Sequence, residues 1–223
     1  MVNNPIRVPV DEALRYMGAA KADPETRRLA EECARTLEDR LVPRFRWRAC
    51  RIERDGGAIR LPEAGIALPG KLARKMLAEC DAAVLLVCTI GAGFDRLEKE
   101  WEARDMARAA VMDTCGSAWT EAVCDAAEEE IKGRFPGKFL TDRFSPGYGD
   151  LPLSLQADFL RALDGGRKLG ITVNESFLLL PCKSVTAVIG LSDGPQGARI
   201  RGCAYCGLRE SCEYRTRGET CGV

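Results

Sequence analysis

Histidine is absent from all 223 residues of this chain. Ser-His-Asp triads, acid–base catalysis by histidine and histidine zinc sites are therefore excluded. An excess of charge is absent too, because 33 lysines and arginines balance 33 aspartates and glutamates. A net charge of zero gives no support for binding to nucleic acid or to another polyanion.

Long apolar segments are missing as well. The longest apolar run, residues 82–88, is far too short to span a bilayer, and the N-terminus has no basic and then apolar leader. We therefore expect a cytoplasmic protein without a membrane partner. Cysteine, by contrast, is frequent, and 11 cysteines in a cytoplasmic chain argue against a disulfide scaffold. Seven of them lie in apolar or helical sequence and are expected to be small buried hydrophobes. These seven are Cys33, Cys50, Cys80, Cys88, Cys115, Cys124 and Cys182.

The rest of the composition is that of an ordinary globular protein, with 46% hydrophobic and 30% charged residues. Asp23-Pro24 combines an N-cap with a proline at the first helical position, and Asp55-Gly56 is a hairpin signal. Residues 83–90 and 184–191 are typical of strands, and residues 105–132 of a long helix. Because helices and hairpin-type strands are mixed without regular βαβ repetition, we expect an α+β fold.

A glycine pair, Gly91 and Gly93, follows the strand predicted over 83–90. The third glycine of a dinucleotide-binding loop is missing, because Phe94, Asp95 and Arg96 come next. A tight turn from strand to helix is therefore predicted here, rather than a phosphate site.

The segment 143–150 reads Arg-Phe-Ser-Pro-Gly-Tyr-Gly-Asp, and a strand over 138–144 is expected to deliver it. Pro146 fixes φ at the first central position of a turn and Gly147 accepts a positive φ at the second, which predicts a type II turn. The planar guanidinium of Arg143 suits a carboxylate. The alternative is an ordinary surface loop with a solvated arginine.

This segment, together with Glu175-Ser176 and the strand over 183–189, resembles the reactivation domain of cobalamin-dependent methionine synthase in its free-standing form. The resemblance covers residues 10–193 and is weaker upstream, through 88–91 and 113–117. It implies a mostly antiparallel twisted sheet with packed helices. It also implies that S-adenosylmethionine binds at the Arg-x-x-Pro-Gly-Tyr segment.

The resemblance assigns expected roles to single residues. Arg143 would pair with the carboxylate of S-adenosylmethionine. The backbone of Ser145, Pro146 and Gly147 would contact the ligand, and Tyr148 would face the corrin as the catalytic aromatic. Glu175 would contact the ammonium or hydroxyl groups of the ligand, with a purely structural role in a strand as the alternative.

The function implied is reductive reactivation of cob(II)alamin by S-adenosylmethionine-dependent methylation. A corrinoid carrier of this family needs a histidine to ligate cobalt, and this chain has none. The cobalamin is therefore expected on a separate corrinoid protein, in particular a split methionine synthase. The alternative is a non-enzymatic iron–sulfur or zinc accessory protein that docks a corrinoid methyltransferase other than methionine synthase. Tight binding of S-adenosylmethionine would distinguish a reactivation protein from an accessory protein that only transfers electrons.

The C-terminus carries four further cysteines at the spacing Cys-x2-Cys-x5-Cys-x8-Cys. These are Cys203, Cys206, Cys212 and Cys221. We therefore divide the chain into an activation-like domain, residues 1–198, and a Cys-rich extension, residues 199–223. A segment so poor in apolar residues cannot bury a core of its own, so a metal centre is the expected organiser.

Four thiolates suit a zinc ion or a [4Fe–4S] cluster, and the remaining alternative is a reduced tail without metal. Reductive reactivation needs a low-potential electron, and zinc has no redox chemistry. We therefore expect the [4Fe–4S] cluster.

Overall fold

The computed structural model describes residues 5–19, 21–200, 210 and 213–218. The fold is α+β, as expected, and is built on an antiparallel four-stranded sheet in the order β1-β5-β9-β6. The strands are β1 Arg44–Arg51, β2 Glu53–Asp55, β3 Ala58–Leu61, β4 Ile66–Pro69, β5 Ala82–Thr89, β6 Phe139–Leu140, β7 Thr172–Val173, β8 Leu179–Leu180 and β9 Ser184–Ser192. The helices are α1 Val10–Tyr16, α2 Pro24–Arg40, η1 Pro62–Ala64, α3 Gly70–Met76, α4 Gly93–Glu102, α5 Met106–Arg134, α6 Leu155–Ala162, α7 Gly165–Leu169 and α8 Glu213–Thr216.

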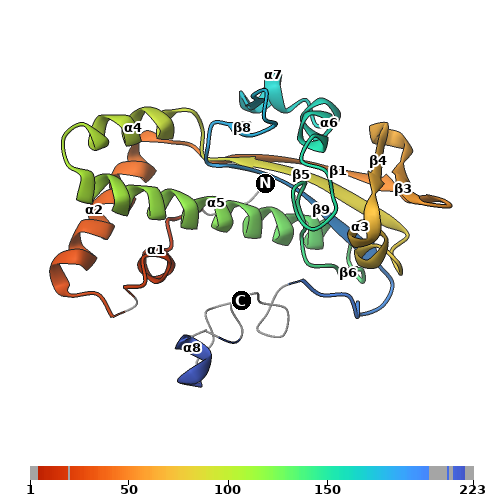
Figure 1. The fold of residues 1–223 in the computed structure, drawn as a ribbon, viewed down its shortest axis with the longest axis horizontal. Helices are drawn as coiled ribbons and strands as arrows, with labels where there is room; N and C mark the ends of the chain where they lie inside the picture. The colour runs from red at the N-terminus through yellow and green to blue at the C-terminus, as the bar shows by residue number, and fades with distance from the viewer. Residues whose placement is uncertain (1–4, 20, 201–209, 211–212, 219–223) are drawn as a thin grey trace.

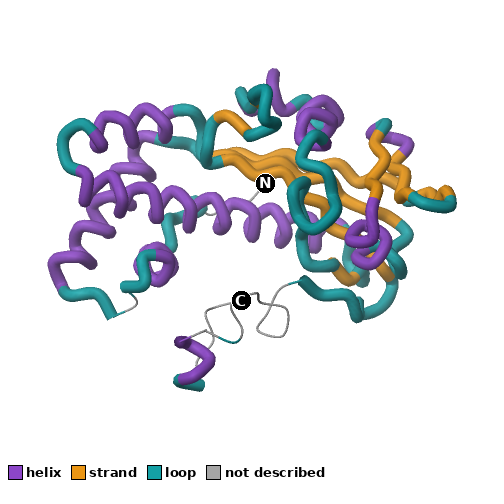
Figure 2. The backbone as a smooth tube through the Cα atoms, in the orientation of Figure 1, coloured by secondary structure: helices purple, strands orange, loops and turns teal. Residues whose placement is uncertain are grey.

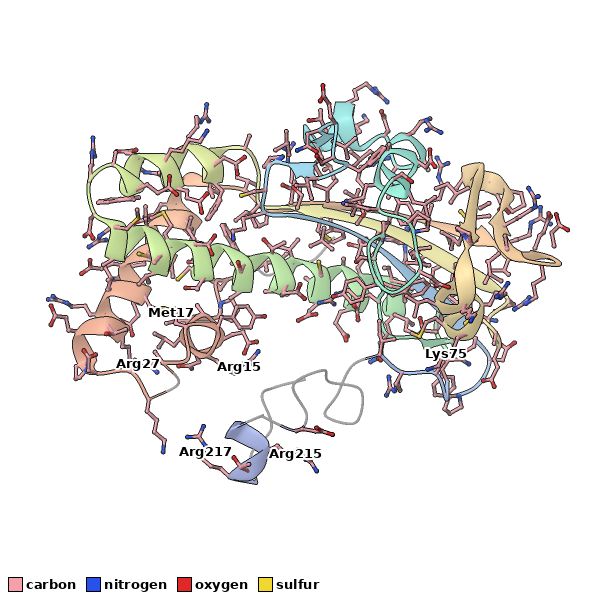
Figure 3. All side chains as sticks on the ribbon, viewed as in Figure 1. Arg15, Met17, Arg27, Lys75, Arg215 and Arg217 are labelled. Carbon is pink, nitrogen blue, oxygen red and sulfur yellow. The ribbon has the colours of Figure 1, made fainter. Side chains whose placement is uncertain are left out.

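The two central strands, β5 and β9, pair over their whole length, from Ala82 opposite Leu191 to Thr89 opposite Ser184. Both are buried on both faces, and alternate side chains therefore enter two different cores. Leu86 packs in the core under α1, α2, α4 and α5, whereas Leu85 packs in the core under the β2-β3-β4 sheet, α3 and α6. Helix α5 runs along the sheet in Figures 1 and 2, and side chains fill both faces in Figure 3.

The helix cap, the hairpin and the tight turn that the sequence predicts are all confirmed, and each depends on neighbouring residues. Asp23 caps α2 by accepting hydrogen bonds from the N–H groups of Glu25 and Thr26. The Asp55-Gly56 hairpin joins β2 and β3. Gly91 has φ 94° in the short turn between β5 and α4, as predicted for a tight turn from strand to helix.

The strand predicted over 138–144 is shorter than expected, because β6 ends at Leu140. Thr141 explains the interruption. Its N–H still donates to the carbonyl of Gly190, but the N–H of Gly190 donates to the Thr141 hydroxyl, at 2.8 Å. A side chain thus replaces a backbone carbonyl in the ladder. Pairing resumes only at the single bridge between Phe144 and Val188.

No described helix combines the length and the apolar character that a bilayer crossing requires.

Candidate functional site

The outer edge of β9 is open over its first half, within the part of the chain that the structure describes. Val188 exchanges two backbone hydrogen bonds with Phe144, at 3.1 and 2.8 Å, and no strand pairs with this edge between Ser184 and Ala187. Backbone groups alternate in direction along a strand, so Ser184 and Thr186 direct their N–H and C=O groups to the same side as Val188. These backbone groups have no strand partner in the described residues, and Ser184 is partly exposed whereas Thr186 is buried, so a ligand reaches the Ser184 end of the edge most directly.

The predicted turn begins where the edge opens. The N–H of Tyr148 donates to the carbonyl of Ser145 at 3.0 Å, and Gly147 has φ 95°. These features confirm the type II turn. Pro146 is buried, whereas the side chain of Tyr148 is 57% exposed. The turn therefore presents Tyr148 to solvent beside an accessible backbone.

Asp150 holds this turn on the scaffold. Its carboxylate accepts hydrogen bonds from the N–H groups of Lys71 and Leu72 at the start of α3, at 2.5 and 3.0 Å. These backbone donors lower the pKa of Asp150. Gly70 has φ 95°, and a Cβ there would lie 2.6 Å from the Asp150 carboxyl carbon, so the close approach requires glycine.

Arg143 points away from the turn, toward α5. Its side chain is only 5% exposed, and its terminal nitrogens donate to Asp125 at 2.7 Å, to Glu121 and to Glu128. The alternative of a solvated surface arginine is therefore wrong. These three carboxylates occupy one face of α5, at i, i+4 and i+7. One guanidinium faces three carboxylates, so this ion cluster has an excess of negative charge.

Glu121 is the residue that the sequence analysis missed. It lines a cavity of about 320 Å³ between α1, α5 and the start of β9. The lining residues are Tyr16, Ser117, Thr120, Glu121, Cys182, Lys183, Ser184 and Val185. Oε2 of Glu121 accepts from Arg143, while Oε1 accepts no hydrogen bond from the residues that the structure describes. The signal for Glu121 in the sequence is the helical spacing of acidic residues over α5. The same spacing is typical of a solvated helix face, so it does not distinguish a site from ordinary surface.

At the other end of the cavity, Lys183 fastens the start of β9 to α5. Its ammonium donates to Asp113 at 2.6 Å and to the Ser117 hydroxyl at 2.8 Å, and it lies 5.2 Å from the centre of the Phe94 ring. The preceding N–H, of Cys182, donates to the carboxylate of Asp95 at 3.2 Å. These contacts fix the position of the open edge relative to α4 and α5.

Glu175 lies in the exposed turn between β7 and β8, and a buried glutamine connects this turn to the edge. The side-chain amide of Gln156 donates to the carbonyl of Phe177 at 3.0 Å, and its oxygen accepts from the hydroxyl of Thr186 at 3.2 Å. The structure thus brings the Arg143, Ser145–Tyr148 and Glu175 segments to one edge of the sheet, but the Arg143 side chain lies on the α5 face and the Glu175 turn on the α6 face. Their contacts with a ligand stay predictions.

Six of the seven scattered cysteines are buried, as expected. Cys182, which lines the cavity, is exposed, so the prediction of burial is wrong for this residue. The four predicted metal ligands, Cys203, Cys206, Cys212 and Cys221, lie outside the described residues. Within the described ranges, no group of three or more Cys, Asp or Glu residues is arranged to hold a metal ion.

Comparison with known proteins supports the fold. No protein-family model matches the chain, and no curated protein is similar to it in sequence. Among solved structures, the chain is similar to the MetH reactivation domain bound to AdoHcy, with a TM-score of 0.62 and 18% sequence identity. The match covers 96% of this chain and 81% of that one. The chain therefore has the fold of the MetH reactivation domain.

Glu98 on α4 gives the stability of the fold a dependence on pH. Burial, and next the hydrogen bond and charge of Asp113, raise the pKa of Glu98 from 4.5 to about 7. Because the folded state keeps this proton where the unfolded state loses it, the free energy of unfolding should fall as pH rises from 4.5 to about 7. Glu98→Gln should flatten this fall in urea titrations at several pH values. Glu129→Gln, an exposed change on α5 that does not act on Glu98, should keep it, and an equal fall in both variants would contradict the assignment.

Proposed function

We propose that this chain binds S-adenosylmethionine along the open edge of β9 and supports the reductive methylation of cob(II)alamin on a separate corrinoid protein. A split methionine synthase is the partner we infer. The observation that carries the proposal is the type II turn at Ser145–Tyr148, set where the edge opens, in the fold of the MetH reactivation domain. The neighbouring structure is bound to AdoHcy, which supports a related ligand here.

The charges around the edge suit this ligand. S-adenosylmethionine carries a sulfonium, an ammonium and a carboxylate, so its cations would be attracted by the excess negative charge of the α5 carboxylates. We infer that the second carboxylate oxygen of Glu121 accepts a hydrogen bond from the ligand's ammonium. Arg143 would pair with the ligand carboxylate either through the two N–H groups that the α5 carboxylates do not use or in exchange for one α5 partner. Asp125 is 66% exposed, so water can solvate it at the least cost.

The turn would serve the partner as well as the ligand. The methyl donor and the partner's corrin supply the chemistry of transfer when both are bound. The chain has to hold the donor in line with the acceptor and keep water away from both. Tyr148 is exposed on a turn fastened by Asp150, and we infer that its ring faces the corrin.

The ligand role of Arg143 can be tested from both sides of the contact. Arg143→Ala should weaken binding of S-adenosylmethionine about ten- to a hundredfold, because a charge-assisted hydrogen bond contributes about 1.5–3 kcal/mol. The same variant should lose little affinity for decarboxylated S-adenosylmethionine, which lacks the carboxylate. Calorimetry with both ligands measures this loss of affinity. Asp125→Asn serves as the control, because it removes a carboxylate charge that competes with the ligand for Arg143. An equal loss for both ligands would assign Arg143 to the scaffold.

Tyr148 should matter for reactivation more than for ligand binding. Tyr148→Ala should bind S-adenosylmethionine as the wild type does but fail to support methylation of a cob(II)alamin-loaded partner. The visible spectrum of the corrinoid under anaerobic conditions follows the reaction. Phe139→Ala, another exposed aromatic but at the far end of β9, should leave the rate unchanged. Normal reactivation by Tyr148→Ala would refute the corrin-facing role.

The Cys-rich extension stays a prediction from the sequence. Protein purified without oxygen should contain iron and sulfide in equal amounts, as a [4Fe–4S] cluster requires. Cys206→Ala should lose the iron, whereas Cys182→Ala, outside the extension, should keep it. Metal and sulfide analysis decides among the alternatives. One zinc ion without iron would make the extension structural and require an external reductant. The absence of both metals would indicate a tail without metal.

A further inference from the structure

Exposed apolar side chains gather at the hairpin formed by β7 and β8. Phe177, Leu178 and Leu180 are 40%, 53% and 45% exposed, and they lie within four consecutive positions. We call these three residues the hairpin tip. The two short strands pair only with each other in the described sheets. Apolar groups that gather on a surface in this way mark a site of contact with another molecule.

The backbone holds the tip in one conformation. Phe177 has φ 61°, in the left-handed region that a residue with a Cβ disfavours. Asn174 stabilises this turn, because its side-chain oxygen accepts from the N–H groups of Ser176 and Leu178, at 3.0 and 2.9 Å. The buried amide of Gln156 holds the carbonyl of Phe177. The ring is thus presented to solvent on a preorganised turn.

A turn alone does not need phenylalanine at this position. Glycine or asparagine would adopt the positive φ at a lower cost. What phenylalanine adds is an exposed ring, and backbone strain that persists beside a candidate site indicates a functional constraint. The ring therefore has a use outside the folding of the hairpin.

The tip borders the candidate site. Gln156 connects Phe177 to Thr186 on the open edge of β9, and the turn with Tyr148 leaves the sheet at the end of the same opening. Figure 1 shows β8, α6 and the segment that follows β6 on the same side of the sheet. A macromolecule that approaches the open edge with its reacting group would cover the tip.

The charge beside the tip limits what this macromolecule is. Glu175 is exposed two residues before Phe177. An anionic side chain at this point opposes nucleic acid and anionic lipid. The preorganised aromatic and its aliphatic neighbours suit a protein surface instead, since such side chains dominate protein interfaces.

We propose that the hairpin tip is the docking surface for the corrinoid protein, separate from the groove that binds the methyl donor. This inference rests on the proposed function, because that function supplies the partner. Phe177 acts as the anchor, and Leu178 and Leu180 exclude water around it. A second copy of this chain is the competing occupant, and the test distinguishes it.

The test uses Phe177→Asn in the full chain, with the cob(II)alamin-loaded cobalamin module of a methionine synthase as the probe. Asparagine tolerates the positive φ, so the melting temperature should not fall. Affinity for S-adenosylmethionine should be unchanged, whereas affinity for the module should fall about tenfold or more, as for the loss of an interface anchor. Leu178→Asn should act in the same direction. Val42→Asn, at an exposed apolar residue beside the opposite edge strand, should not.

The outcomes are distinct. Phe177→Asn that binds the module as tightly as the wild type would overturn the inference and leave the proposed function intact. Wild-type protein that docks the module but does not bind S-adenosylmethionine would overturn the proposed function and support the docking surface. A wild-type dimer that Phe177→Asn dissociates in sedimentation experiments would assign the tip to self-association and overturn the inference.

Discussion

The full-length pairing of β5 with β9 is the constraint from which the other features of the candidate site follow. Both strands are buried on both faces, so each side of the sheet needs its own covering layer. The chain covers one side with α1, α2, α4 and α5 and the other with the small sheet, α3 and α6. The faces are covered, but the edges are not, and within the described residues only the second half of the β9 edge is paired. The opening is therefore a consequence of where pairing stops.

Three long-range contacts then fix what surrounds the opening. Asp150 holds the Tyr148 turn on α3, Gln156 holds the Glu175 turn against β9, and Lys183 holds the start of β9 on α5. Each contact joins segments at least 30 residues apart in the sequence, and each uses a polar side chain. A site built on loops gains precision only from such contacts, because the loops have no ladder of their own.

The sequence predicted the features that depend on neighbouring residues and failed on those that depend on distant ones. The turn at Pro146-Gly147 and the cap at Asp23 are set by the chemistry of two or three adjacent residues, and both are confirmed. The fold class followed from the pattern and from resemblance. The burial of Arg143 could not be predicted, since its partners lie 15 to 22 residues earlier on α5. The early end of β6 was equally hidden, because it depends on which group of Thr141 meets Gly190.

The Arg143 cluster also shows why a residue can match a motif and still differ in environment. A guanidinium that faces three carboxylates has two of its five N–H groups left for a ligand carboxylate, and its charge reduces the negative field of the α5 carboxylates. A cationic ligand benefits from the remaining field, whereas an anionic ligand would be repelled by it. Under the proposed function, the cluster therefore suits a ligand with more positive than negative groups. S-adenosylmethionine satisfies this requirement, and its demethylated product, which has lost the sulfonium charge, satisfies it less well. Under the proposed function, the loss of the sulfonium charge would therefore weaken the attraction between the demethylated product and the α5 carboxylates.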